Sequence, residues 1–214
     1  MTLQEVLSSI TPADREAMAL SQKKWDAVGK PLGSLGLLED MVVRMAGVFG
    51  TPDFSIDQKA VAIFCGDNGV VAEGVTQTGQ EITAVVAENM ARRRSSVCKM
   101  ARVAGAEICP VDVGMAFPVE HPGLVQKNIR RGTRNFVQEP AMTREETERA
   151  ILVGVETVRD LYNRGARLIA TGEMGIGNTT TSAAVLSVLL GREPAEMTGR
   201  GAGLSNEGLA RKIR

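Results

Sequence analysis

Three short apolar runs stand out along the chain, and an acidic residue and glycine follow each of them closely. The runs occupy residues 60–65, 106–111 and 167–171. Continuous apolar runs of this length are typical of strands that are buried on both faces of a parallel sheet. The pattern therefore predicts three parallel strands.

Segments with helical character surround these runs. Thr11 followed by Pro12 indicates a helix start, with threonine as the N-cap and proline at the first helical position. Thr143 and Glu146 have the spacing of a capping box. The expected helices are residues 11–28, 37–48, 81–93, 95–103, 143–164 and 205–214.

Alternation of strands and helices predicts an α/β fold with a doubly wound parallel sheet. The N-terminal part is helical throughout, so we expect a helical segment over residues 1–50 and a parallel α/β domain over residues 51–214. Sheets of this kind bind ligands outside the carboxyl ends of their strands.

Acidic side chains follow all three expected strands. They are Asp67, Asp112 and Glu173. Parallel strands end at the same edge of a sheet, so we expect these carboxylates to converge there. Acidic residues after strands are also common structural caps, and both interpretations stay open.

Charge and composition exclude several classes of protein. Lysine plus arginine and aspartate plus glutamate both number 25, so the 214-residue chain has no formal net charge. This argues against binding of nucleic acid by the whole chain. The three cysteines show no C-x-x-C spacing and there is one histidine, so we expect no metal and a reduced, cytoplasmic setting.

One uncharged stretch, Met174–Gly191, approaches the length of a membrane span. Its first half is too polar for a helix that faces lipid. We interpret it as a loop that leads into a buried helix, and expect no membrane partner.

The stretch 171–181 is the most informative candidate site. Gly175 and Gly177 allow the backbone to approach a ligand, and Asn178 or Thr179 could cap the following helix. Free N–H groups at a helix start favour phosphate. The stretch fits neither a Walker loop nor a dinucleotide fingerprint, and an ordinary glycine-rich turn is the alternative. Glu173 could act as a base, hold ribose hydroxyls or bind backbone amides.

Two other loops carry suitable groups. Residues 199–204 form a second glycine-rich loop, and Lys212 follows it. This lysine could bind phosphate through its positive charge, or it could be an ordinary solvated side chain. Residues 74–83 offer hydroxyl and amide groups that could line a pocket for a flat heterocycle or simply connect two elements.

Five segments occur together in an order that is specific. They are residues 30–39, 66–70, 73–75, 173–180 and 199–204. On these segments the chain resembles the nicotinate-nucleotide–dimethylbenzimidazole phosphoribosyltransferase (CobT) family over essentially its whole length. The resemblance implies a Rossmann-like parallel sheet, a small helical domain built from both chain ends, a homodimer, and no metal or other cofactor.

The same resemblance implies a reaction. The phosphoribosyl group of nicotinate mononucleotide passes to 5,6-dimethylbenzimidazole, which gives nicotinate and α-ribazole 5′-phosphate for the lower-ligand nucleotide of cobalamin. It also implies site residues, with Glu173 near the ribose. The residues that it implies for binding the phosphoribosyl group are Gly175, Gly177, Asn178, Thr179, Thr180 and Lys212. Those for binding the acceptor base are Thr78, Gln80 and Val86, and Asp67 and Gly201 are further substrate-binding residues.

The chain departs from the family pattern in two respects. Many members carry histidine where Asn68 stands. Family members also continue beyond residue 214, and the glutamate regarded as their general base belongs to that later part. The alternatives are therefore a shortened enzyme, a module that binds nucleotide or base without turnover, and a partner subunit of a longer homologue.

Overall fold

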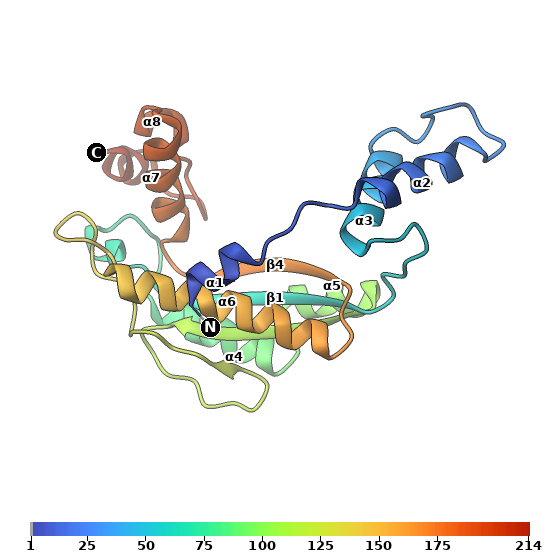
Figure 1. Cartoon of the computed structure of the whole chain (residues 1–214). Coiled ribbons are helices and arrows are strands. Elements are labelled where there is room, and N and C mark those ends of the chain that lie inside the picture. The colour runs from blue at the N-terminus through green and yellow to red at the C-terminus, as the bar shows by residue number, and fades with distance from the viewer. Residues whose placement is uncertain (1) are drawn as a thin grey trace. The chain divides into compact units, whose positions relative to one another are not determined.

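Figure 1 shows the computed structural model of the chain, which describes residues 2–214. The chain divides into two compact units, Met1–Ile56 and Asp57–Arg214. Every strand of the described chain lies in the second unit.

Within residues 2–56, the first unit contains three helices, α1 (Leu3–Ser8), α2 (Arg15–Asp26) and α3 (Leu37–Phe49). The predicted start of α2 at Thr11 is wrong. Asp14 is the N-cap, and its carboxylate accepts hydrogen bonds from the backbone N–H groups of Glu16 and Ala17 at 2.8 and 3.0 Å. A carboxylate that reaches two free N–H groups is a better cap than a threonine followed by proline.

The second unit is built on a parallel sheet of four strands, three of which the apolar runs predicted. Its strands are β1 (Lys59–Gly66), β2 (Ala106–Gly114), β3 (Val125–Gln126) and β4 (Leu168–Met174). The strand order is β3-β2-β1-β4, and each pair is parallel. The sequence pattern missed β3 because two residues are too few to show a period.

Helices cover both faces of the sheet, which confirms the doubly wound prediction (Figure 1). Ile63 and Cys65 of β1 pack toward α4 (Glu81–Ala91) and α5 (Ser96–Ala104). The alternate β1 residues, Ala60 and Ala62, pack toward α6 (Arg144–Asn163). The period of two along β1 therefore assigns one hydrophobic cluster to each face.

The capping box at the start of α6 is present. The Thr143 hydroxyl accepts a hydrogen bond from the Glu146 backbone N–H at 3.1 Å, and Glu146 Oε2 accepts one from the Thr143 N–H at 2.7 Å. The same carboxylate accepts a hydrogen bond from Arg134 Nη1 at 2.8 Å. Glu146 thus joins the start of α6 to the loop before it.

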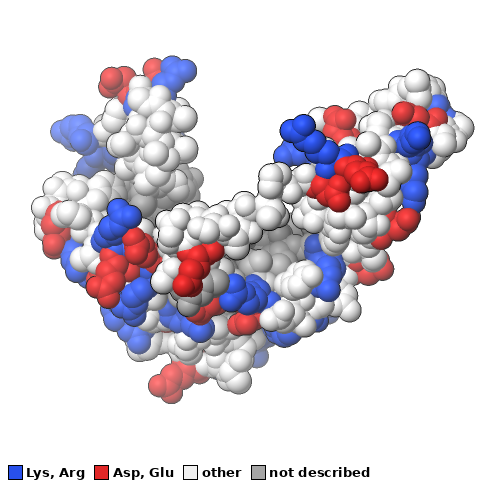
Figure 2. Space-filling model, viewed as in Figure 1, with Lys and Arg blue, Asp and Glu red and all other residues white. Residues whose placement is uncertain are grey.

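The last part of the chain forms α7 (Asn178–Leu190), α8 (Pro194–Met197) and α9 (Asn206–Ile213). The expectation that α7 is buried is wrong. Within the described chain, neighbouring elements cover only one narrow side of α7. Five of its apolar side chains are between 45% and 82% exposed: Val185, Leu186, Val188, Leu189 and Leu190. Figure 2 shows a mostly uncharged surface at the upper left, in the region where α7 lies in Figure 1. No helix within residues 2–214 is long and apolar enough to cross a membrane.

Replacing Glu146 tests how this ion pair stabilises the fold. The hydrogen bond from Arg134, with smaller help from the Thr143 N–H and Arg130, lowers the pKa of Glu146 from 4.5 to about 2. The folded pKa lies below the unfolded one, so the stabilisation is complete above pH 4.5 and is lost as the pH falls toward 2. In urea unfolding, we expect Glu146→Gln to be less stable than wild type at pH 7, and the difference to shrink below pH 4.5.

The exposed neighbour Glu145 supplies the matched control. Glu145→Gln makes the same charge change, and we expect its smaller effect to vary little over this range. A deficit of Glu146→Gln that stays constant down to pH 2.5 would contradict the assignment.

Candidate active site at the carboxyl edge of the sheet

The carboxyl ends of β1, β2 and β4 bring the three strand-end acids to one edge of the sheet. Asp112 pairs with Cys65, and Glu173 pairs with Phe64, while Asp67 directly follows β1. The three carboxylates nevertheless have different surroundings: Asp67 and Asp112 are buried and Glu173 is exposed.

Asp67 joins the elements that surround this edge. Its side chain accepts hydrogen bonds from the Thr83 hydroxyl of α4 at 2.6 Å and from the Ala116 backbone N–H at 2.8 Å. The Thr83 hydroxyl in turn accepts a hydrogen bond from the Ile176 N–H at 3.1 Å, in the turn after β4. Burial raises the pKa of Asp67, and its two hydrogen bonds oppose that shift. Asp67 is thus a link inside the protein that fixes the position of the turn.

The turn from β4 into α7 passes directly over the end of β1. A Cβ on Gly175 would lie 2.1 Å from the Gly66 carbonyl oxygen, and Gly177 has a φ of +89°. Glycine is therefore required at both positions. Gly177 itself is the N-cap of α7, so the predicted side-chain cap by Asn178 or Thr179 is wrong.

The Asn178 side chain is occupied by Glu173 instead. Its Nδ2 donates a hydrogen bond to Glu173 Oε2 at 2.8 Å. Glu173 is exposed at the sheet edge, but the protein on one side of its carboxyl group excludes water, and this raises the pKa of Glu173. The hydrogen bond from Asn178 lowers the pKa and so opposes this shift. A carboxylate with a raised pKa accepts a proton more readily than an ordinary glutamate.

A cavity of about 160 Å³, here called the glycine-loop pocket, lies beside this turn. Three loops and α9 contribute its lining, which comprises residues 75–78, 175–179, 200–202, 204 and 212. Arg200 and Lys212 are its charged residues, and no carboxylate lines it within the described chain. Cations, glycine backbone and a helix start form a site for an anion such as phosphate.

Lys212 holds two sides of the pocket together. Its Nζ donates hydrogen bonds to the Thr179 hydroxyl at 2.8 Å and to the Gly199 carbonyl at 3.1 Å. Burial lowers the pKa of Lys212. Gly201 has a φ of +57°, and a Cβ there would lie 2.8 Å from the Thr179 hydroxyl. The second glycine-rich loop therefore approaches α7 as closely as its backbone allows.

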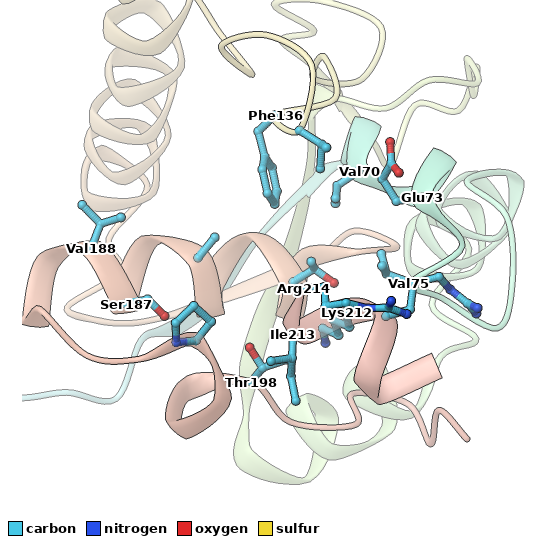
Figure 3. Close-up of a pocket in the computed structure, with 15 residues that line it drawn as sticks. Val70, Glu73, Val75, Phe136, Ser187, Val188, Thr198, Lys212, Ile213 and Arg214 are labelled. Carbon is cyan, nitrogen blue, oxygen red and sulfur yellow. The ribbon is translucent and has the colours of Figure 1, made fainter. Parts of the chain in front are cut away.

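A second and larger cavity, the α7 pocket, lies beyond Lys212 (Figure 3). Its volume is about 590 Å³, and Val75 and Lys212 line both it and the glycine-loop pocket. Figure 3 shows the Phe136 ring directed into this space. The Thr180 hydroxyl, on its α7 wall, is buried and has no hydrogen-bond partner in the described chain.

The structure brings together most, but not all, of the expected site residues. Seven of them line the glycine-loop pocket: Thr78, Gly175, Gly177, Asn178, Thr179, Gly201 and Lys212. Thr180 lines the α7 pocket instead. Gln80 donates a hydrogen bond to the Asn68 carbonyl at 3.2 Å, and Val86 packs against the hydrophobic cluster under α4.

Three further residues belong to this edge. Arg200 adds a cation to the glycine-loop pocket, and its position among the glycines of residues 199–203 was a usable signal. Thr83 donates the hydrogen bond that connects α4 to Asp67, and no local sequence pattern indicates this role. Asn68 donates to the Ile176 carbonyl at 3.1 Å and accepts from Thr181 at 2.8 Å, so it supports the turn. No group of three or more His, Cys, Asp or Glu side chains in residues 2–214 could hold a metal ion.

Together these features define an α/β protein with a pocket lined by two cations and glycine backbone at the carboxyl edge of a parallel sheet. The family model described as "Phosphoribosyltransferase" (DBI_PRT) matches residues 10–214. The chain belongs to this phosphoribosyltransferase family.

Curated relatives and a solved structure agree with the family model. The nicotinate-nucleotide–dimethylbenzimidazole phosphoribosyltransferase of Ruminiclostridium cellulolyticum is 44% identical over 213 residues, which are 100% of this chain and 60% of that protein. The protein of the same name from Acetivibrio thermocellus is 44% identical over 209 residues, 98% of this chain and 60% of that protein. The crystal structure of CobT from Thermus thermophilus superposes with a TM-score of 0.88 at 41% identity, over 92% of this chain and 60% of that one. The chain thus spans about 60% of the length of these relatives.

Removing the Thr83 hydroxyl tests the link from Asp67 to the glycine-rich turn. Thr83→Val keeps the shape of the side chain but leaves buried hydrogen-bonding groups of Asp67 and Ile176 without a partner. We expect a loss of about 1–3 kcal/mol in the free energy of unfolding, measured in urea. Thr83→Ser keeps the hydroxyl and should lose less, and equal stability of both variants would contradict the link.

Replacing Lys212 tests the anion-binding role of the glycine-loop pocket. Lys212→Met removes the buried ammonium, and we expect ribose 5-phosphate to bind roughly tenfold more weakly, the effect of one charge-assisted hydrogen bond. Calorimetric titration measures the affinity. Lys99→Met, at an exposed lysine of α5, is the control, and an unchanged affinity in Lys212→Met would exclude this role.

Proposed function

We propose that the protein transfers the phosphoribosyl group of nicotinate mononucleotide to 5,6-dimethylbenzimidazole. The products are nicotinate and α-ribazole 5′-phosphate, which serves assembly of the cobalamin lower-ligand nucleotide. The glycine-loop pocket, with Lys212 and Arg200 beside the N-terminus of α7, is the observation that carries the proposal. The names of the relatives support this choice of substrates.

The phosphate of the donor binds against the Gly175–Gly177 turn and Lys212, so that C1 of the ribose faces the acceptor. The bond from C1 to the nicotinate nitrogen breaks, and its electron pair neutralises the pyridinium. A benzimidazole nitrogen attacks C1 from the opposite face, which inverts the anomeric centre from β to α. The proton on the other benzimidazole nitrogen passes to a carboxylate base.

Glu173 contributes near the ribose, and its contact with Asn178 supports this role. Asn178 lines the glycine-loop pocket and binds Glu173 on its other side. Glu173 therefore orients Asn178 on the wall of the pocket. The resemblance implies that the main base of the family belongs to the part of the relatives that this chain does not span.

The acceptor base occupies the space next to Thr78, which lines the glycine-loop pocket. Gln80 and Val86 shape this space from behind, Gln80 through its bond to Asn68 and Val86 through the packing of α4. The unit Met1–Ile56 contributes to a small helical domain. The protein works as a homodimer in the cytoplasm and needs no cofactor.

Binding without turnover is the second candidate. It is favoured by the lack of any carboxylate among the described residues that line the glycine-loop pocket. In that case the chain retains nicotinate mononucleotide or the base, and catalysis needs the glutamate that longer relatives supply.

One assay separates the two candidates. The folded chain is incubated with both substrates, and nicotinate and α-ribazole 5′-phosphate are followed by chromatography. For a self-sufficient enzyme we expect product that depends on both substrates, that is lost in Glu173→Gln and that persists in the exposed control Glu120→Gln. Because the pKa of Glu173 is raised, the rate should fall with decreasing pH already above pH 4.5. Binding of nicotinate mononucleotide without product would contradict self-sufficient turnover and support the second candidate.

A further inference from the structure

Strand β2 has an open edge over its first half. On the side away from β1 it pairs with β3 only at Val111 and Asp112, so residues 106–110 have no neighbouring strand there within the described chain. An unpaired strand edge presents backbone N–H and C=O groups that a strand of another molecule can bind. Two copies of the chain could therefore associate through this edge unless something in the structure opposes it.

The backbone groups that face the open side follow from the pairing of β3. The Asp112 carbonyl accepts a hydrogen bond from the Lys127 N–H at 2.9 Å, so the backbone of Asp112 faces β3. Every second residue of a strand directs its backbone groups to the same side, so Pro110 and Ile108 face the open side beyond the start of β3. Proline has no N–H group. Position 110 therefore offers no donor to a further strand.

Arg93 occupies the acceptor at position 108. Its Nη1 donates a hydrogen bond to the Ile108 carbonyl oxygen at 2.6 Å. Arg93 and Ile108 also line one cavity of about 300 Å³ beside the first half of β2. Hydrogen bonds from charged donors are stronger than those between neutral groups. A strand that pairs with this part of β2 would first have to displace the guanidinium group.

The backbone of Arg93 is unusual for a residue with a side chain. Arg93 follows the end of α4 with a φ of +60°, and every other positive φ within residues 2–214 belongs to a glycine. The helices α3, α5 and α7 end in the same left-handed conformation with Gly50, Gly105 and Gly191. Glycine adopts this conformation at a lower cost than arginine. The arginine is therefore not explained by the helix end, and its side chain supplies what glycine lacks.

The charge beside this edge acts in the same direction. The segment 92–102 contains no acidic residue and five cations: Arg92, Arg93, Arg94, Lys99 and Arg102. A second copy that approached edge to edge would bring the same cations against these. Like charges repel, and charged side chains at a strand edge oppose pairing between molecules.

We propose that Arg93 and Pro110 keep the open edge of β2 from pairing with the same edge of a second copy of the chain. The edge lies at the beginning of β2, whereas the glycine-loop pocket lies at the carboxyl ends of the strands, so this role does not depend on phosphoribosyl transfer. The homodimer of the proposed function then uses a different surface.

Two variants remove the hydrogen bond to Ile108 and suit the left-handed backbone. They are Arg93→Gly and Arg93→Asn, whose side chains are too short to replace the guanidinium. Light scattering measures the molar mass over a range of protein concentrations, and amide hydrogen exchange locates new strand pairing. We expect self-association about tenfold tighter than in wild type, because one charged hydrogen bond no longer has to be broken, with new protection at residues 106–110.

Pro110→Val tests the second part of the proposal and leaves Arg93 in place. It restores a backbone N–H on the open side, and we expect tighter self-association with protection of the same residues. Because this variant does not alter α4, it also decides the question if the Arg93 variants fail to fold.

Arg94→Gly is the matched control, because it makes the same substitution at the next residue, an exposed arginine. It lowers the charge equally but leaves the hydrogen bond to Ile108, so we expect a much smaller effect. Self-association at the wild-type level in the folded Arg93 and Pro110 variants would overturn the proposal. Tighter association without protection at residues 106–110, or an equal effect in Arg94→Gly, would also overturn it.

Discussion

The buried carboxylate of Asp67 is the interaction on which the arrangement of this sheet edge depends. It accepts hydrogen bonds from Thr83 of α4 and from Ala116 in the loop after β2. The Thr83 hydroxyl also accepts a hydrogen bond from the Ile176 N–H in the glycine-rich turn. Its backbone adds bonds to Gly114 at 2.9 Å and from Thr133 at 2.9 Å. One side chain and its own peptide groups thus fix the relative positions of segments that are far apart in the sequence.

That fixed edge carries the glycine-loop pocket. Within the described chain the pocket is lined by two cations, Arg200 and Lys212, and by no carboxylate. The hydrogen bond from Asn178 to Glu173 joins the pocket to the strand-end acid beside it. A cationic pocket and an acid thus lie next to each other at the end of β4.

Local chemistry explains which features the sequence could predict. The three strands follow from apolar runs without period, and the cap at Thr143 follows from its spacing to Glu146. The start of α2 was misplaced because the competition between Thr11 and Asp14 for the first turn depends on loop geometry. The exposure of α7 could not be foreseen either, since its uniformly apolar sequence says nothing about what covers it.

The site shows the same division between local and distant information. The glycines and Lys212 were found because anion-binding loops have a recognisable local composition. Thr83 was not, because its link from Asp67 to Ile176 joins segments that are far apart in the sequence. The contact of Gly175 with Gly66 has a genetic consequence. Every missense codon adds a Cβ, which would lie 2.1 Å from a carbonyl oxygen, whereas nothing lies within 4 Å of a Cβ at Gly199. Purifying selection should therefore keep the Gly175 codon to synonymous changes and leave the Gly199 codon freer to drift.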